Sequence, residues 1–188
     1  MMKFPASPAP HRQTERLRLG RNSLVGAVYF VTFVTTDRTP WLAAPTATQA
    51  LLKALRTWHE EHDGSVLAAS VMPDHAHVLF SLGSKLEVGR CVSRWKAVAQ
   101  RLSGYPGKWQ RDFWEHRLRD VEGWEDYALY IFLNPYRAGL LRHGSWPGWW
   151  APEAGWFRFL GCLEPDGGPP TEWLAWSDDR FANITTSE

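Results

Sequence analysis

The sequence predicts an α+β protein with a ferredoxin-like split β-α-β antiparallel sheet and an additional C-terminal helix. Three observations lead to this prediction: four runs rich in β-branched or aromatic residues, two helical segments between them, and a further helical segment after the fourth run. The resulting order, β-α-β-β-α-β followed by α, is the pattern of that fold. The fold assigns no function by itself, because many activities share it.

The first half of the chain contains three of the strands. Residues 27–36 (AVYFVTFVTT) are β-branched and aromatic and predict a strand. Residues 46–62 place leucines and a tryptophan at helical spacing, so they predict a helix. Residues 65–72 and 75–82 predict two further strands, which the turn residues Pro73-Asp74 join into a hairpin.

The second half supplies the remaining elements. Residues 85–103 predict a basic amphipathic helix that ends at Gly104, and residues 109–119 predict the fourth strand. Residues 123–133 predict the last helix. We expect this helix to end at Asn134, because the residue before a proline avoids the helical region.

Charge divides the chain unevenly. Residues 151–188 hold seven carboxylates against two arginines, which leaves the first 150 residues basic. A basic body with an acidic tail is found in polyanion binders, although ordinary surface charge also produces it. We therefore expect a basic N-terminal arm (1–24), one folded body (25–145) and a Trp-rich acidic tail (146–188).

Several classes of protein are excluded by what the sequence lacks. No apolar run approaches the roughly 20 residues that a membrane span requires, and no apolar leader follows the first methionine. The two cysteines are far apart, so neither a disulfide scaffold nor a cysteine-rich zinc site is expected. These observations favour a cytoplasmic protein without a membrane partner.

Two pairs of residues carry candidate chemistry. His75 and His77 are two apart on a predicted strand, so both side chains point to one face and can chelate one cation. Tyr130 and Asn134 are four apart on the last predicted helix, so they share a face, with a hydroxyl that can act as a nucleophile. Two imidazoles and an amide oxygen suit Mg²⁺ or Mn²⁺ better than a closed zinc site. The alternative is that none of these residues is functional: the histidines are structural, the tyrosine packs in the core and the asparagine caps the helix.

A basic and aromatic segment follows the histidines. Residues 84–119 hold nine Lys and Arg against three acidic residues, with Trp and Tyr interleaved. Single-stranded nucleic acid requires such charge for its phosphates and such rings for its bases, although a solvated helix face has the same composition. The candidate DNA-binding residues in this segment are Arg94, Lys96, Arg101, Trp109 and Arg111.

These motifs together resemble a known family. VMPDHAHVLF (71–80) resembles the HUH segment of IS200-like (Y1) transposases, with Ala76 where that family usually has a bulkier apolar residue. WQRDFWEHRLRD (109–120) and YIFLNPYRAGL (130–140) are similar to the REP-associated tyrosine transposases. The resemblance implies a metal-dependent endonuclease and strand transferase that acts on single-stranded DNA beside hairpins, through a 5′-phosphotyrosine.

The resemblance also implies roles for individual residues. His75, His77 and Asn134 match the metal ligands, with Mg²⁺ or Mn²⁺ as the cofactor, and Tyr130 matches the nucleophile. Tyr127 and Tyr136 are the second and third candidates for the nucleophile, and His116 is a candidate base. In the family, residues before the first strand help to recognise DNA, and here they include Arg16, Arg18 and Arg21. The IS200 enzymes are dimers, whereas similarity to the REP-associated branch implies a monomer, so we expect a monomer, with a dimer as the alternative.

Other functions remain open. A non-catalytic protein that binds DNA hairpins can keep the fold, and a relaxase-like nickase can share the chemistry. A relaxase usually has extra histidines and a longer body, and this chain has no P-loop for a nucleotide. A histidine-triad or two-histidine phosphoesterase is disfavoured, because the repeats of histidine that each requires are missing.

Overall fold

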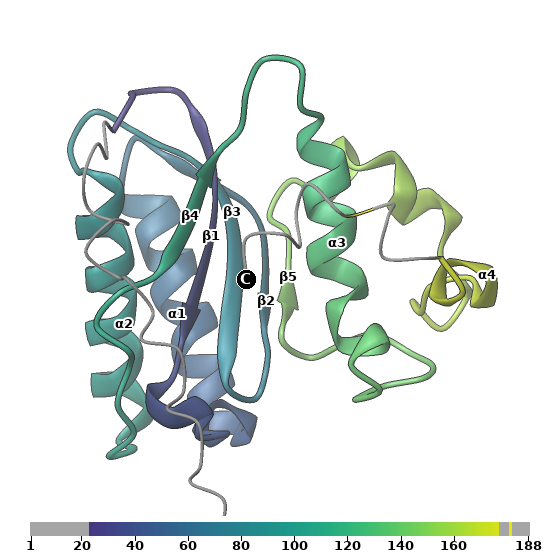
Figure 1. Cartoon of the computed structure of the whole chain (residues 1–188), viewed down its shortest axis with the longest axis horizontal. Coiled ribbons are helices and arrows are strands. Elements are labelled where there is room, and N and C mark those ends of the chain that lie inside the picture. Colours follow the sequence, from purple (N-terminus) through teal and green to yellow (C-terminus); the bar gives the residue numbers. More distant parts are fainter. Residues whose placement is uncertain (1–22, 177–180, 182–188) are drawn as a thin grey trace, which may run out of the picture.

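The computed structural model describes residues 23–176 and residue 181, and it contains one five-stranded antiparallel sheet (Figure 1). The strands lie in the order β4-β1-β3-β2-β5. Their bounds are β1 (Val28–Val34), β2 (Ser65–Val71), β3 (His75–Ser81), β4 (Trp114–Arg117) and β5 (Trp149–Trp150). The first four strands have the arrangement of a split β-α-β fold, so the predicted α+β class is confirmed.

Helices cover both faces of this sheet. Helices α1 (Pro45–Glu61) and α2 (Val88–Ser103) pack side by side against one face, and α3 (Trp124–Arg137) lies against the other (Figure 1). The remaining helices are short: η2 (Thr36–Arg38), η3 (Trp41–Ala43), η4 (Ala154–Trp156), η5 (Arg158–Cys162) and α4 (Thr171–Leu174). Within the described residues, no helix combines the length and the apolar character that crossing a membrane requires.

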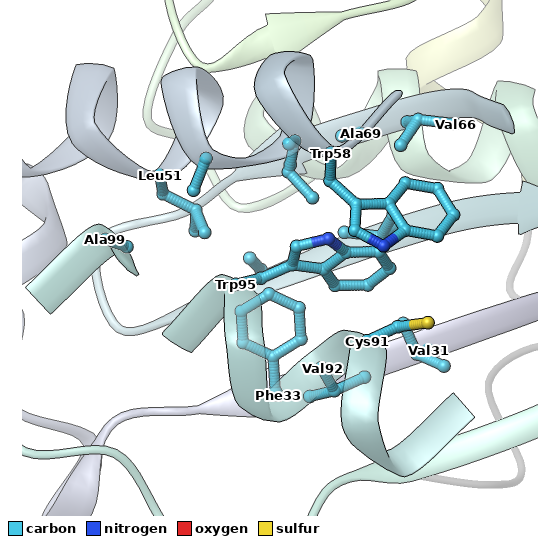
Figure 2. Close-up of a cluster of buried hydrophobic side chains, with 14 of the residues drawn as sticks. Val31, Phe33, Leu51, Trp58, Val66, Ala69, Cys91, Val92, Trp95 and Ala99 are labelled. Atoms are coloured by element: carbon cyan, nitrogen blue, oxygen red, sulfur yellow. The ribbon is translucent and has the colours of Figure 1, made fainter. Parts of the chain in front are cut away.

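The core beneath α1 and α2 is aromatic and closely packed. Trp58 of α1 and Trp95 of α2 meet edge to face, with ring centroids 5.2 Å apart (Figure 2). Phe80 of β3 contacts both indoles, at 5.7 Å and 5.0 Å between centroids. Because these rings are almost fully buried, they join the two helices to the sheet through one continuous cluster.

Alternation along the central strands decides which side chains face α3. On β3, Ala76 and Val78 point into the core under α1 and α2, so their neighbours His77 and Leu79 point to the opposite face. On β1, Phe30 likewise faces α3 and lies in the second core. The histidines of β3 therefore face the last helix, and not the basic helix α2.

The predicted end of the last helix is wrong. Helix α3 continues through Asn134 and Pro135 to Arg137. Pro135 lies close to the C-terminal end, where Ala138 N–H donates to the Asn134 carbonyl at 2.9 Å and Gly139 adopts a left-handed φ of 70°. The helix therefore loses only the hydrogen bond that Pro135 cannot donate. As a consequence, Asn134 keeps a helical geometry on the same face as Tyr130.

Two strands differ from the prediction. Strand β4 spans only Trp114–Arg117 of the predicted 109–119; before it, Trp109 forms an isolated bridge with Thr35, and the carbonyls of Gln110 and Asp112 accept hydrogen bonds from the Lys96 ammonium. Strand β5 is not predicted from the sequence, because it is too short to show alternation. It follows Gly148, where a Cβ atom would clash with the Val71 carbonyl oxygen. Although β5 belongs to the expected tail, it joins the sheet; the division of the chain at 24 and 145 stays a prediction.

Candidate functional site at the junction of β1, β3 and α3

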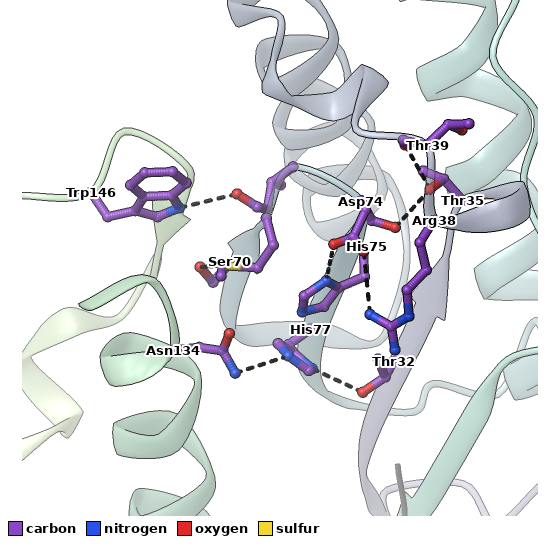
Figure 3. Close-up of polar contacts among 12 residues, drawn as sticks. Thr32, Thr35, Arg38, Thr39, Ser70, Asp74, His75, His77, Asn134 and Trp146 are labelled. Atoms are coloured by element: carbon purple, nitrogen blue, oxygen red, sulfur yellow. Dashed lines mark hydrogen bonds and ion pairs between the residues drawn. The ribbon is translucent and has the colours of Figure 1, made fainter. Parts of the chain in front are cut away.

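His77 occupies the centre of the site. It is fully buried on β3 and pairs in register with Thr32 of β1. Its Nδ1 lies 2.8 Å from the Thr32 hydroxyl oxygen, and its Nε2 lies 3.2 Å from the Asn134 amide nitrogen (Figure 3). Since the Asn134 amide donates to Nε2 in this arrangement, Nδ1 carries the proton and donates to Thr32. Nε2 is then the nitrogen with a lone pair, and it faces α3.

The protonation of His77 follows from its burial. Loss of solvation holds its pKa well below the usual range, with smaller contributions from His75 and Arg38. The imidazole is therefore neutral at pH 7, which is the form that binds a metal ion.

His75 lies beside His77 and closer to the surface. The two ring centroids are 4.8 Å apart and the rings are nearly perpendicular, with 81° between their planes. His75 Nδ1 lies 2.6 Å from a carboxylate oxygen of Asp74, and Figure 3 shows this contact on the side of the ring away from Asn134. Hydrogen bonds from His75 and Arg38 outweigh the effect of burial and lower the pKa of Asp74.

Helix α3 brings Tyr130 to the same place. The Tyr130 ring lies 5.6 Å from the His77 ring and 6.0 Å from the ring of Phe30, centroid to centroid. Because Tyr130 and Asn134 are one turn apart on α3, the phenol and the amide approach the imidazoles from one side. The structure thus brings together all four residues that the sequence assigned to chemistry.

The donor set fits a divalent cation that prefers nitrogen and oxygen ligands. Two ligand atoms bound to one octahedral ion at about 2.1 Å lie about 3 Å apart, and Nε2 of His77 and the Asn134 amide are separated by 3.2 Å. Turning the amide over would place its oxygen where the nitrogen lies. In residues 23–176 and 181, no group of three or more His, Cys, Asp and Glu side chains could hold a metal. The imidazoles of His75 and His77 with the Asn134 amide are therefore the candidate metal ligands.

The alternative tyrosines are held elsewhere. The Tyr127 hydroxyl donates to Glu122 at 3.2 Å, and burial together with this carboxylate raises the pKa of Tyr127. The Tyr136 hydroxyl donates to the Gly144 carbonyl at 2.7 Å, and burial raises its pKa. His116, the candidate base, stacks on Tyr127 and directs Nε2 to Glu122 at 3.0 Å. Tyr127, His116 and Glu122 thus form one cluster, Tyr136 is bound separately to Gly144, and each phenol donates a hydrogen bond and is not activated.

The predicted DNA-binding residues are not gathered around this site. The Lys96 ammonium is buried and donates to two carbonyls, and the Trp109 indole donates to the Lys96 carbonyl at 3.1 Å, so both contribute to the core. Arg94 and Arg101 are exposed on α2, which covers the sheet face opposite to His77. Arg111 is exposed in the segment before β4. Arg16, Arg18 and Arg21 lie outside the described residues.

Several residues of the site were not found from the sequence. Asp74 could have been noticed, since it directly precedes His75 and a carboxylate often supports a metal-bound imidazole. Thr32 gave no signal, because its contact with His77 depends on the register of β1 against β3. Phe181 lies far along the chain, yet its ring is buried 5.8 Å from that of Tyr130, centroid to centroid.

Comparison with known proteins identifies the class to which this fold and site belong. A family model described as "Transposase IS200 like" matches residues 23–119, which is more than half of the chain. The protein therefore belongs to the IS200-like transposase family. The matched segment runs from before β1 to just after β4 and includes both histidines of β3, whereas α3 lies beyond it.

Within this family, the chain is similar to REP-associated tyrosine transposases. The chain is 27% identical over 131 residues to the REP-associated tyrosine transposase of Escherichia coli (strain K12), covering 68% of this chain and 78% of that protein. A relative from Haemophilus influenzae is 27% identical over 143 residues, covering 68% of this chain and 81% of its own length. A solved REP-associated tyrosine transposase bound to a REP hairpin has the same fold, with a TM-score of 0.57 and 24% identity over 65% of this chain and 74% of the other.

Proposed function

We propose that this protein is a metal-dependent endonuclease and strand transferase for single-stranded DNA beside hairpins, with Tyr130 as the nucleophile. The observation that supports it is the position of the Tyr130 ring, 5.6 Å from the ring of the buried His77, on the helix face that also presents Asn134.

The reaction follows from the groups present. His75, His77 and Asn134 would hold a divalent cation, which would supply a Lewis acid for the scissile phosphate. The Tyr130 oxygen attacks phosphorus and loses its proton to solvent, the bond between phosphorus and the 3′ oxygen breaks, and that oxygen takes up a proton. The product is a 5′-phosphotyrosine with a free 3′-OH. Because one phosphodiester replaces another, a 3′-OH can reverse the step and join strands without a nucleotide cofactor.

The choice of DNA rests on similarity and charge. A solved relative is bound to a REP hairpin, and this chain shares its fold. A tyrosine that must attack in line needs an unpaired backbone, which a single strand next to a hairpin offers. We propose that Arg111 and the N-terminal arm with Arg16, Arg18 and Arg21 contribute phosphate contacts, whereas Arg94 and Arg101 bind any DNA on the opposite face of the sheet.

The test is formation of a covalent adduct. The full chain is incubated with Mn²⁺ and an oligonucleotide that carries a hairpin with single-stranded flanks, and adducts stable in SDS are mapped by peptide mass. Wild type should form an adduct at Tyr130, and Tyr130→Phe should form none while binding the oligonucleotide normally. Tyr127→Phe, on the same helix, is the matched control and should keep the adduct. Binding without any adduct in wild type would instead favour the non-catalytic hairpin-binding protein.

A further inference from the structure

Both carboxylate oxygens of Asp74, the residue before β3, accept hydrogen bonds from side chains. One oxygen accepts from His75 Nδ1 at 2.6 Å, and the other accepts from the Arg38 guanidinium at 3.2 Å (Figure 3). The Asp74 backbone carbonyl accepts from Thr35, both from its N–H at 2.8 Å and from its hydroxyl at 2.9 Å. The main chain of Asp74 is thus fixed independently of its carboxylate, which is directed at His75.

Arg38 reaches Asp74 from a strained loop. Asp37 and Arg38 have positive φ values of 55° and 50°, a conformation that is unfavourable for residues other than glycine. Hydrogen bonds hold this loop in place: Thr36 N–H donates to the Lys108 carbonyl at 2.8 Å, and the Thr39 hydroxyl donates to the Thr36 carbonyl at 2.9 Å. Strain of this kind persists where the surroundings enforce it. Here it directs the Arg38 guanidinium to the carboxylate of Asp74, beside the candidate metal ligand His75.

The two histidines have different partners at Nδ1, and burial explains the difference. His77 is fully buried and has the neutral Thr32 hydroxyl, since an ionised carboxylate beside it would lose its hydration. The His75 side chain keeps 15% of its exposure and that of Asp74 keeps 21%, so a charged partner is tolerated there. In both cases Nδ1 is occupied by the protein, which leaves Nε2 as the nitrogen that can bind a cation.

We propose that Asp74, held by Arg38, is a positioning residue that fixes the tautomer and orientation of His75 for the metal. This inference rests on the proposed function, because it requires His75 to be a ligand. The carboxylate accepts a hydrogen bond from Nδ1–H, which keeps the proton on Nδ1 and the lone pair on Nε2 and makes Nε2 a better ligand. Arg38 acts one step further away, by holding the carboxylate against the imidazole.

The first measurement needs no metal. Long-range proton–nitrogen NMR of the metal-free full chain at pH 8 reports which nitrogen of each imidazole carries the proton. Wild type should show His75 protonated at Nδ1, and Asp74→Ala should shift it to a mixture of tautomers while His77 stays unchanged. Asp74→Asn should restore much of the Nδ1-protonated form, because its amide oxygen still accepts the hydrogen bond. An unchanged His75 tautomer in Asp74→Ala would overturn the proposal.

The second measurement is Mn²⁺ affinity, by titration calorimetry. Asp74→Ala should weaken binding about 10- to 100-fold and Arg38→Ala by less. Glu61→Ala is the matched control, since it removes a carboxylate paired with an arginine, Arg94, on the opposite side of the sheet. If His75→Ala weakens Mn²⁺ binding and Asp74→Ala does not, Asp74 is not a positioning residue, although His75 is still a metal ligand. If His75→Ala binds Mn²⁺ as tightly as wild type does, His75 is not a metal ligand, and both the proposed metal site and the positioning role of Asp74 are wrong.

Discussion

The Asn134 amide nitrogen lies 3.2 Å from Nε2 of His77, so helix α3 is joined to the central strand β3 by a polar contact across 57 residues of sequence. His77 is fully buried, and its other nitrogen is bonded to Thr32. The contact therefore gives the second nitrogen of a buried imidazole a hydrogen-bond partner. It also places an amide beside the nitrogen that we expect to bind the cation.

Removing this amide should affect both stability and metal binding. In Asn134→Ala, the buried His77 loses the hydrogen bond at Nε2, and we expect the free energy of unfolding to fall by about 1–3 kcal/mol. Urea unfolding in the absence of metal measures this effect, and calorimetry with Mn²⁺ should show weaker binding.

Gln100→Ala separates the two effects. The Gln100 amide donates to the Gly107 carbonyl at 2.7 Å from α2, so its loss should also lower stability. Gln100 lies on α2, which covers the sheet face opposite to His77, so Mn²⁺ affinity should not change. Equal Mn²⁺ binding by Asn134→Ala and wild type would remove Asn134 from the ligand set.

Lys96 should behave as a structural residue. Its ammonium donates to the carbonyls of Gln110 at 2.9 Å and Asp112 at 3.3 Å, and it lies over the rings of Phe33 and Phe113. Lys96→Ala leaves these carbonyls without the charged donor, so we expect a loss of about 2–3 kcal/mol in urea unfolding. The salt dependence of oligonucleotide binding should keep its slope, because no phosphate contact is lost.

Arg101→Ala is the control for Lys96. Arg101 is exposed on the same helix, and its removal should change the free energy of unfolding by less than about 0.5 kcal/mol. If Lys96→Ala left stability unchanged and lowered the salt slope by about one, Lys96 would be a DNA contact after all.

What the sequence could predict depends on how local each signal was. The strands of the first half and helices α1 and α2 have strong periodic patterns, and the order of elements confirmed the fold class. The pairing of His75 with His77 and of Tyr130 with Asn134 was also local, since it follows from spacings of two and four. The end of α3 was predicted wrongly, because a rule for the residue before proline was outweighed by packing of α3 and by its closing hydrogen bonds.

Contacts between distant segments could not be predicted. Thr32 reaches His77 only through strand register, and Arg38 reaches Asp74 only through a loop with two positive φ values. The basic helix shows the opposite failure, since composition alone could not separate the buried Lys96 from its exposed neighbours Arg94 and Arg101. In each case the decisive quantity was burial or register, which a local pattern does not contain.

Asp63 should make the free energy of unfolding depend on pH in the acidic range. Its carboxylate accepts from the N–H and the hydroxyl of Ser84, both at 2.6 Å, and these hydrogen bonds lower its pKa to about 2. The folded pKa lies below the unfolded value of about 3.9, so this contribution is complete above about pH 4 and is lost as the pH falls towards 2.

The matching variant is Asp63→Asn, measured by urea unfolding at several pH values. Its stability should fall less steeply than that of wild type between pH 4 and pH 2, since the amide does not titrate. Parallel curves for the two proteins over this range would show that the Ser84 contacts do not bind the ionised carboxylate preferentially.

Phe181 should restrict access to Tyr130. Its ring lies 5.8 Å from the Tyr130 ring and beneath the Arg137 guanidinium, which is 4.9 Å from its centroid, and Tyr130 is only 5% exposed. A phosphodiester must reach the oxygen of this nearly buried tyrosine, and we expect the neighbouring Phe181 ring to hinder its approach. We therefore expect Phe181→Ala to form the covalent adduct several-fold faster than wild type, in a time course with saturating oligonucleotide and Mn²⁺.

Because Phe181 is buried, its replacement should also cost about 3–5 kcal/mol of stability, so the rates must be compared well below the unfolding temperature of the variant. Trp156→Ala removes an aromatic side chain that is 53% exposed and contacts Trp124, so it should leave the rate of adduct formation unchanged. A folded Phe181→Ala variant that forms the adduct no faster than wild type would mean that Phe181 supports the packing of α3 without limiting access to its tyrosine.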